Sequence, residues 1–183
     1  MVVCRRGDGA GRLTANLRAA GYRPEQIDEI YITHLGPDHV GGLTRGTERA
    51  FPNAMVRAPK NIKAGKFESI EEDIVLTPGI RALATHGHAP GHTSYVVESK
   101  AQTLIVMGDL VLMDALQFAN PSLRSSFDAD PRAAAEQRLR VFKMASEDDL
   151  WVAGAHLSFP GIGHIRAAQG RYFWAPAIYT IPQ

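Results

Sequence analysis

The chain has 183 residues, of which 45% are hydrophobic and 21% are charged, and its net charge is +1. This composition is typical of an ordinary globular protein, and the length predicts a single domain over residues 1–183 with a sizeable core. A net charge so close to zero gives no support for nucleic acid or an anionic membrane as a partner. The single cysteine, Cys4, excludes an intramolecular disulfide framework and fits a reducing compartment.

The sequence shows no targeting or membrane-spanning segment. Its first residues, Met1–Arg6, are basic, but no apolar run follows them, as a secretory signal would require. The most apolar stretch, Thr103–Ala119, is interrupted by Asp109 and Asp114 and therefore does not predict a membrane span. We expect no signal peptide and no membrane partner. The chain as it stands is expected to be cytoplasmic, with its native compartment left open.

The first part of the chain predicts a loop, a helix and two strands. Glycines at positions 7 to 11 favour a flexible start, and a short helix then ends at Gly21. Strands are predicted at Ile27–Thr33 and Asn53–Ala58, and the polar segment Lys60–Lys66 is predicted to be a connection. The apolar face of the helix consists of Leu13, Leu17 and Ala20.

The second part predicts strands on either side of one long helix. The helix begins with Asp130 as its N-cap and Pro131 in its first turn, and its buried stripe is predicted to be Ala135, Leu139 and Phe142. This order of strands, helix and strands indicates a mixed α/β sandwich. The predicted strands are Asp73–Thr77, Ile80–Thr85, Ser94–Glu98, Thr103–Met107 and Leu150–Ala155, with short closing strands at Ile165–Arg166 and Tyr172–Trp174.

All seven histidines lie in three short segments that are rich in glycine and proline. In each of the three segments the first histidine follows a predicted strand end, where functional groups commonly lie in layered α/β proteins. A carboxylate, Asp109, ends the apolar strand between the second and third segments. The segments are 33–42 with His34 and His39, 85–94 with His86, His88 and His92, and 153–165 with His156 and His164.

Together these residues predict a metal centre. Imidazole and carboxylate groups bind divalent zinc, manganese, iron and cobalt alike. A lone histidine in a loop is more often a surface or hydrogen-bonding residue, but three such segments and a strand-end carboxylate favour a common site. His86 and His164 are the weakest candidates, and we expect them to support ligands instead of binding metal.

The first histidine segment has a gap at Gly36. Residues 33–42 read Thr-His-Leu-Gly-Pro-Asp-His-Val-Gly-Gly, which matches the pattern His-x-His-x-Asp-His except that glycine replaces the second histidine. The side chains of His34, Asp38 and His39 remain as candidate ligands. What the protein does depends largely on whether the metal site survives this gap.

Four segments resemble the metallo-β-lactamase superfamily and, within it, the methyl parathion hydrolase-like enzymes. They read GRLTANLRAAGY, PEQIDEIYITHLGPDHVGGL, PGIRALATHGHAPGHTSYVVES and AGAHLSFPGIGHIR. The resemblance runs from Gly11 to the C-terminus and implies an αββα sandwich with a two-metal site at one sheet edge. It also implies that N-terminal strands and a helical insert after Pro59 are missing. An exposed sheet edge would then favour a homodimer or larger homo-oligomer.

Carried over by motif, the resemblance implies six metal ligands, of which Asp38 and Asp109 are also the catalytic carboxylates. The first site's third histidine would stand at Gly36, so that site is weakened, and we expect one tightly held ion and a second that is weakly held or absent. One or two divalent ions are expected as the cofactor, with zinc as the first choice. The implied ligands are His34 and His92 for the first ion, Asp38, His39 and His156 for the second, and Asp109 as the bridge.

The resemblance implies a metal-dependent hydrolase, in which a metal-activated hydroxide attacks a small-molecule phosphotriester, aryl ester or lactone. An alternative of a different class is a catalytically degraded remnant that folds and binds metal but has little turnover. A third alternative is thioester or β-lactam hydrolysis, which other members of the superfamily perform. Chelator-sensitive hydrolysis of an aryl ester or an aryl phosphotriester would distinguish the first alternative from the second.

Overall fold

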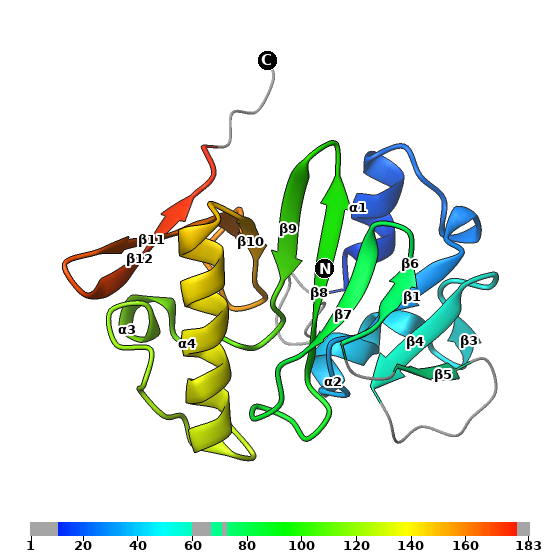
Figure 1. Cartoon of the computed structure of the whole chain (residues 1–183). Helices are drawn as coiled ribbons and strands as arrows, with labels where there is room; N and C mark the ends of the chain where they lie inside the picture. Colours follow the sequence, from blue (N-terminus) through cyan, green and yellow to red (C-terminus); the bar gives the residue numbers. More distant parts are fainter. Residues whose placement is uncertain (1–10, 60–66, 71–72, 179–183) are drawn as a thin grey trace. The chain divides into compact units, whose positions relative to one another are not determined.

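A computed structural model describes residues 11–59, 67–70 and 73–178, and Figure 1 shows their helices and strands. The chain divides into two compact units, Met1–Ile70 and Glu71–Gln183, and each contains its own sheet. The single domain predicted from the length stays a prediction. The predicted flexible start, up to Ala10, and the predicted connection Lys60–Lys66 lie outside the described residues.

The first unit contains a three-stranded parallel sheet in the order β1-β4-β5 and a short antiparallel hairpin, β2-β3. Ile30 on β1 pairs with Val56 on β4, which pairs in turn with Phe67 on β5. The elements are α1 (Leu13–Ala19), the 3-10 helix η1 (Pro24–Gln26), β1 (Glu29–Tyr31), α2 (Pro37–Val40), the 3-10 helix η2 (Gly41–Leu43), β2 (Thr44–Arg45), β3 (Glu48–Arg49), β4 (Met55–Pro59) and β5 (Phe67–Ile70).

Small apolar clusters hold the first unit together. The predicted helix is confirmed as α1, and Gly21 follows it with a φ of +88°, a conformation that suits glycine. The strand predicted at Ile27–Thr33 is confirmed over its middle only, because Ile27 ends η1. In one cluster Leu13, Leu17, Ile27 and Ile30 pack on the buried Ala50, Phe51 and Ala54, and in the other Ile30, Val40 and Leu43 pack on Ile32, Val56 and Ala58.

The second unit contains a seven-stranded sheet in the order β12-β11-β10-β9-β8-β7-β6. Every neighbouring pair is antiparallel except β9 and β10, and the helices α3 and α4 lie in the crossover between these two strands, as a parallel pair requires. The elements are β6 (Val75–Thr77), β7 (Ile80–Ala84), β8 (Thr93–Ser99), β9 (Gln102–Val106), α3 (Asp114–Gln117), α4 (Pro131–Glu147), β10 (Trp151–Ala153), β11 (Ile162–Ala168) and β12 (Arg171–Pro176).

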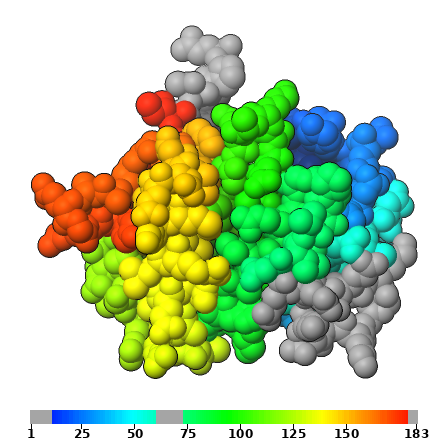
Figure 2. Space-filling view, viewed as in Figure 1, coloured from blue at the N-terminus to red at the C-terminus, as the bar shows by residue number. Residues whose placement is uncertain are grey.

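Helix α4 begins as predicted, since the Asp130 side chain accepts hydrogen bonds from the backbone N–H groups of residues 132 and 133. Its buried stripe is only partly as predicted. Leu139 is 38% exposed and the prediction for it is wrong, because the buried face is rotated toward Arg138, which is fully buried. The outer face of α4 is open at the surface in Figure 2. The side chains of α4 that are buried are Ala134, Ala135, Arg138, Val141, Phe142 and Ala145.

The core of the second unit lies between α4 and the sheet. Phe118 stacks on Phe142 of α4, with ring centroids 4.9 Å apart, and on Trp174 of β12, with centroids 5.5 Å apart. The predicted strands of this unit are confirmed with small shifts, and the two closing strands are longer than predicted. The mixed α/β prediction is therefore confirmed. Within the described residues, no helix is both long and apolar enough to cross a bilayer.

Candidate metal centre

The segment that follows β1 turns back on itself in the first unit. Gly36 is the N-cap of α2, and its carbonyl accepts hydrogen bonds from His39 N (2.8 Å) and Val40 N (3.1 Å). This turn brings the ring of His39 to 3.9 Å from that of His34, measured between centroids, and both residues are buried. Asp38 Oδ2 lies 3.5 Å from His39 Nε2. Two imidazoles and a carboxylate therefore lie together in this unit.

Gly36 lies among these side chains. A Cβ atom at this position would be 2.8 Å from His34 Nε2 and 2.8 Å from Asp38 Oδ1. The backbone angles of Gly36, φ −57° and ψ 138°, are open to any L-residue, so a side chain would meet close contacts and no backbone strain. Both nearby atoms are the ends of rotatable side chains and could move away. A side chain at position 36 would therefore point toward the candidate ligands His34 and Asp38.

In the second unit, His92 is fully buried and both of its ring nitrogens have partners. Its Nδ1 lies 3.1 Å from the carbonyl oxygen of Thr85 and 2.9 Å from the Thr85 hydroxyl. Because a carbonyl oxygen can only accept, Nδ1 carries the proton. Nε2 is then an acceptor, and it accepts the backbone N–H of Asp109 at 3.1 Å. Thr85 thus fixes the tautomer that a metal-binding imidazole needs.

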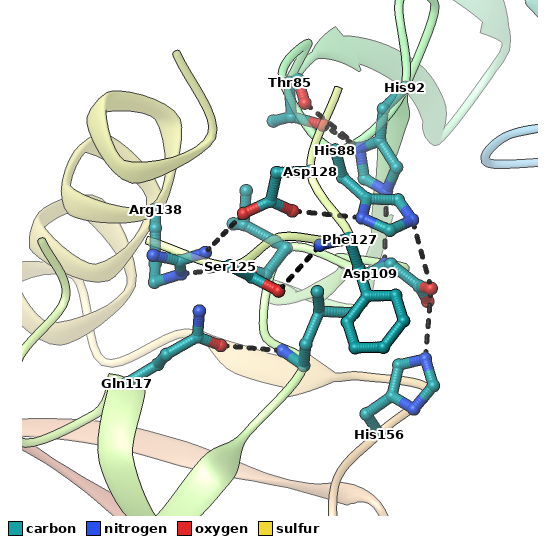
Figure 3. Close-up of polar contacts among 12 residues, drawn as sticks. Thr85, His88, His92, Asp109, Gln117, Ser125, Phe127, Asp128, Arg138 and His156 are labelled. Carbon is teal, nitrogen blue, oxygen red and sulfur yellow. Dashed lines mark hydrogen bonds and ion pairs between the residues drawn. The ribbon is translucent and has the colours of Figure 1, made fainter. Parts of the chain in front are cut away.

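The Asp109 carboxylate lies at the centre of a histidine group in the second unit (Figure 3). Asp109 is 3% exposed, and its Oδ2 lies 3.0 Å from His156 Nε2 and 3.5 Å from His88 Nε2. The sequence predicted His156 and Asp109 as ligands but assigned no role to His88. The rings of His88 and His92 meet edge to face, with centroids 6.0 Å apart. Two imidazoles therefore lie beside one buried carboxylate, and a third, that of His92, accepts the backbone N–H of the same residue.

His88 is connected to a buried ion pair. Its Nδ1 lies 3.1 Å from Oδ1 of Asp128, and Oδ2 of Asp128 lies 3.9 Å from Nη2 of Arg138, with both side chains fully buried. Burial lowers the pKa of Arg138, and the negative charge of Asp128 opposes this shift, so the guanidinium stays charged. Arg138 donates further hydrogen bonds to the carbonyl oxygens of Leu110 (2.7 Å), Pro121 (2.7 Å) and Leu123 (3.0 Å).

The side chains of each unit suit a divalent metal ion, since imidazole and carboxylate are the ligand types that zinc and related metals take. His164 has a different setting, with Nδ1 3.1 Å from Asp149 Oδ1 and its ring 4.1 Å from that of Trp151. Of the six predicted ligands, His34, Asp38 and His39 lie together in the first unit and His92, Asp109 and His156 in the second.

Two curated enzymes are similar to part of this chain. The chain is 26% identical over 146 residues to an N-acyl homoserine lactonase of Bacillus cereus, a match that covers 73% of the chain and 58% of the lactonase. It is 34% identical over 94 residues to a hydroxyacylglutathione hydrolase of Photobacterium profundum, which covers 49% of the chain and 37% of that enzyme. The chain thus spans less than two thirds of the length of either relative.

Two solved structures are similar over 96% of the chain. One is the hydrolase AbOPH in the beta lactamase superfamily, with a TM-score of 0.84 and 30% identity, of which the chain covers 72%. The other is AidC, a dizinc quorum-quenching lactonase in complex with a product, with a TM-score of 0.87 and 22% identity, of which the chain covers 73%. They confirm the predicted fold class, while the methyl parathion hydrolase-like subgroup stays a prediction.

The family model of the Metallo-beta-lactamase superfamily matches residues 6–156, which is most of the sequence. This range includes the segments 33–42 and 85–94 and both Asp109 and His156. Together with the likeness to AbOPH, the match shows that the chain belongs to the metallo-beta-lactamase superfamily.

Proposed function

We propose that the protein is a metal-dependent hydrolase of small-molecule esters, acting on lactones, aryl esters or phosphotriesters. The observation that carries this proposal is the buried Asp109 carboxylate, which lies three residues beyond the end of β9 with His156 and His88 beside one of its oxygens. The N-acyl homoserine lactonase among the relatives supports ester hydrolysis as the reaction class.

The proposed ligand assignment follows the superfamily motif. It draws on both units of the chain and rests on family membership, since the superfamily match includes the histidine segments of both. We propose zinc as the ion, and the dizinc lactonase among the structural relatives supports this choice. The proposed ligands are His34 and His92 for a first ion, Asp38, His39 and His156 for a second, and Asp109 for both.

A bound divalent cation would lower the pKa of water toward ~7 and would polarise the carbonyl or phosphoryl oxygen of an ester. The residues of the chain prepare its ligands. The Thr85 carbonyl accepts the Nδ1 proton of His92, so that this ring presents an unprotonated Nε2. Asp109 supplies a carboxylate that is shielded from water and is therefore weakly solvated.

The test is hydrolysis of three substrates, an N-acyl homoserine lactone, a chromogenic aryl ester and an aryl phosphotriester, by the purified chain with and without a chelator. We expect turnover of at least one substrate, loss of this turnover with the chelator, and its recovery when zinc is added back. Turnover that the chelator leaves unchanged would contradict the proposal. Metal binding without turnover of any ester would select the degraded remnant.

The degraded remnant is the second candidate because of Gly36. In the motif, this position carries an imidazole, and in this chain it carries no side chain, although it points toward His34 and Asp38. One ion would then be held tightly and the other weakly. Metal analysis of protein purified without added metal tests this asymmetry, and two tightly held equivalents per chain would contradict it.

A homodimer also stays a prediction. Within the described residues, β1 pairs with β4 on one side only, and an unpaired strand edge favours association with another chain. Light scattering at micromolar concentration measures the assembly, and a monomer would contradict the prediction.

A further inference from the structure

We propose that His88 is itself a metal ligand, sharing one ion with Asp109. The ligand set implied by the superfamily motif does not include it. The inference rests on the proposed metal-dependent function, but it concerns a different residue and can fail on its own.

The distance between the His88 and Asp109 side chains suits two ligands of one metal ion. His88 Nε2 and Asp109 Oδ2 are 3.5 Å apart, which is longer than the 2.7–3.2 Å of an ordinary N–H···O hydrogen bond. Two donors that each lie about 2.1 Å from one tetrahedral zinc ion are about 3.4 Å apart. The observed spacing therefore suits two ligands of the same ion better than a direct hydrogen bond.

The second ring nitrogen of His88, Nδ1, has the kind of partner that a metal-binding histidine needs. A metal-binding histidine almost always donates its other ring N–H to a carboxylate or carbonyl oxygen. His88 Nδ1 lies 3.1 Å from Oδ1 of Asp128, a carboxylate whose side chain is fully buried. This contact orients the ring and leaves Nε2 toward Asp109 (Figure 3).

The buried Asp128 carboxylate beside His88 is paired with a buried cation. Arg138 lies 3.9 Å away and supplies the compensating positive charge. Its hydrogen bonds to the carbonyl oxygens of Leu110 and Leu123 fasten the segment between β9 and α4 to the helix. A buried ion pair of this kind is expensive to build, and here it holds the Asp128 carboxylate beside His88. Asp128 is therefore a positioning residue, which acts through His88.

The sharpest test replaces the proposed ligand by a thiolate. We compare His88→Cys with His164→Cys, a matched control in which the altered residue of the same unit contacts Asp149 and Trp151. Metal-free protein is titrated with Co²⁺, because a thiolate bound to cobalt gives an intense near-ultraviolet charge-transfer band. We expect the band in His88→Cys and its absence in His164→Cys and in the unaltered chain.

A second measurement uses His88→Asn, Asp128→Asn and His164→Asn, with Zn²⁺ affinity read from competition with a chromophoric chelator. We expect a loss of about 100-fold for His88→Asn, about 10-fold for Asp128→Asn and no change for His164→Asn. Circular dichroism of the metal-free variants confirms that they fold. Should the unaltered chain bind metal while His88→Asn binds it equally well and His88→Cys gives no band, His88 is not a ligand. Failure of the unaltered chain to bind metal would overturn the proposed function as well.

Discussion

The two groups of candidate ligands are supported in different ways. In the second unit each of two imidazoles has its own partner, Thr85 for His92 and Asp128 for His88. In the first unit two imidazoles share the single hydroxyl of Thr33, at 3.2 Å and 3.4 Å. A ligand whose second nitrogen is hydrogen-bonded is oriented before the metal arrives. The two groups therefore orient their imidazoles through different partners: a carbonyl and a carboxylate oxygen in the second unit, and a hydroxyl that lies near both rings in the first.

The largest expected effect compares a carboxylate from each group. The side chain of Asp109 is 4% exposed and that of Asp38 is 31% exposed, so Asp109 is less solvated and should contribute more to metal binding and catalysis. We expect Asp109→Asn to lower turnover on the order of 1,000-fold, which corresponds to the several kcal/mol that metal catalysis supplies. Asp38→Asn should lower it less. Metal content and turnover are measured together, with the exposed Asp148→Asn as control. Equal losses of turnover in the two variants would contradict the larger contribution that we expect of Asp109.

The next prediction concerns the ion pair beneath the second group. Arg138→Met leaves the Asp128 carboxylate buried without its cation, and we expect the free energy of unfolding to fall by about 3–5 kcal/mol. The matched control on the same helix is Arg132→Met, whose partner Glu136 is 3.0 Å away but well exposed. That variant should lose less than about 1 kcal/mol. Urea denaturation of the metal-free proteins measures both.

The outcome of this pair of variants bears on how the second group is built. If Arg138→Met were as stable as Arg132→Met, the buried charges would not be needed to hold the segment between β9 and α4. If it is much less stable, adding Asp128→Asn should restore part of the loss, since the uncompensated charge is then removed.

The third prediction concerns a variant that adds the missing imidazole to the candidate ligands of the first unit. Gly36→His adds an imidazole beside His34 and Asp38, whose ends must rotate to admit a Cβ at 2.8 Å. We expect metal affinity to rise about 10-fold and turnover to rise with it, because an additional donor outweighs a small rearrangement. Gly36→Ala is the matched control, since it introduces the same contacts without a donor, and it should lower affinity. A histidine variant no better than the alanine variant would show that position 36 does not serve a metal.

The sequence was a good guide where one local signal dominates. Asp130 and Pro131 predicted the start of α4, and Gly21 predicted the end of α1, because capping depends on neighbouring residues. Long apolar strands were found for the same reason. The hairpin β2-β3 was missed, since its two-residue strands are exposed and have no apolar pattern.

Tertiary partners explain what sequence patterns could not reveal. The predicted stripe of α4 included Leu139, but Arg138 occupies the buried face because it finds Asp128 and three carbonyl oxygens there. Asp128 is also what distinguishes His88 from other loop histidines, and it lies 40 residues further along the chain. The histidine was visible in the sequence, but its carboxylate partner could only be found in the folded structure.

The smallest expected effect tests the sheet that carries the first group. Glu29 on β1 accepts hydrogen bonds from the Tyr31 hydroxyl and from Arg57 Nη2 (2.8 Å), and these contacts lower the pKa of its carboxyl. A lowered pKa stabilises the fold at pH values above the unfolded pKa, and this stabilisation is lost as the pH falls through the folded pKa. Because the Arg57 and Glu29 side chains are 26% and 33% exposed, we expect Glu29→Gln to cost about 0.5 kcal/mol near neutral pH. Urea denaturation at several pH values should show the two proteins converging below about pH 4. A difference in the free energy of unfolding that grows on acidification would mean that the Glu29 carboxylate does not stabilise the strand leading to His34.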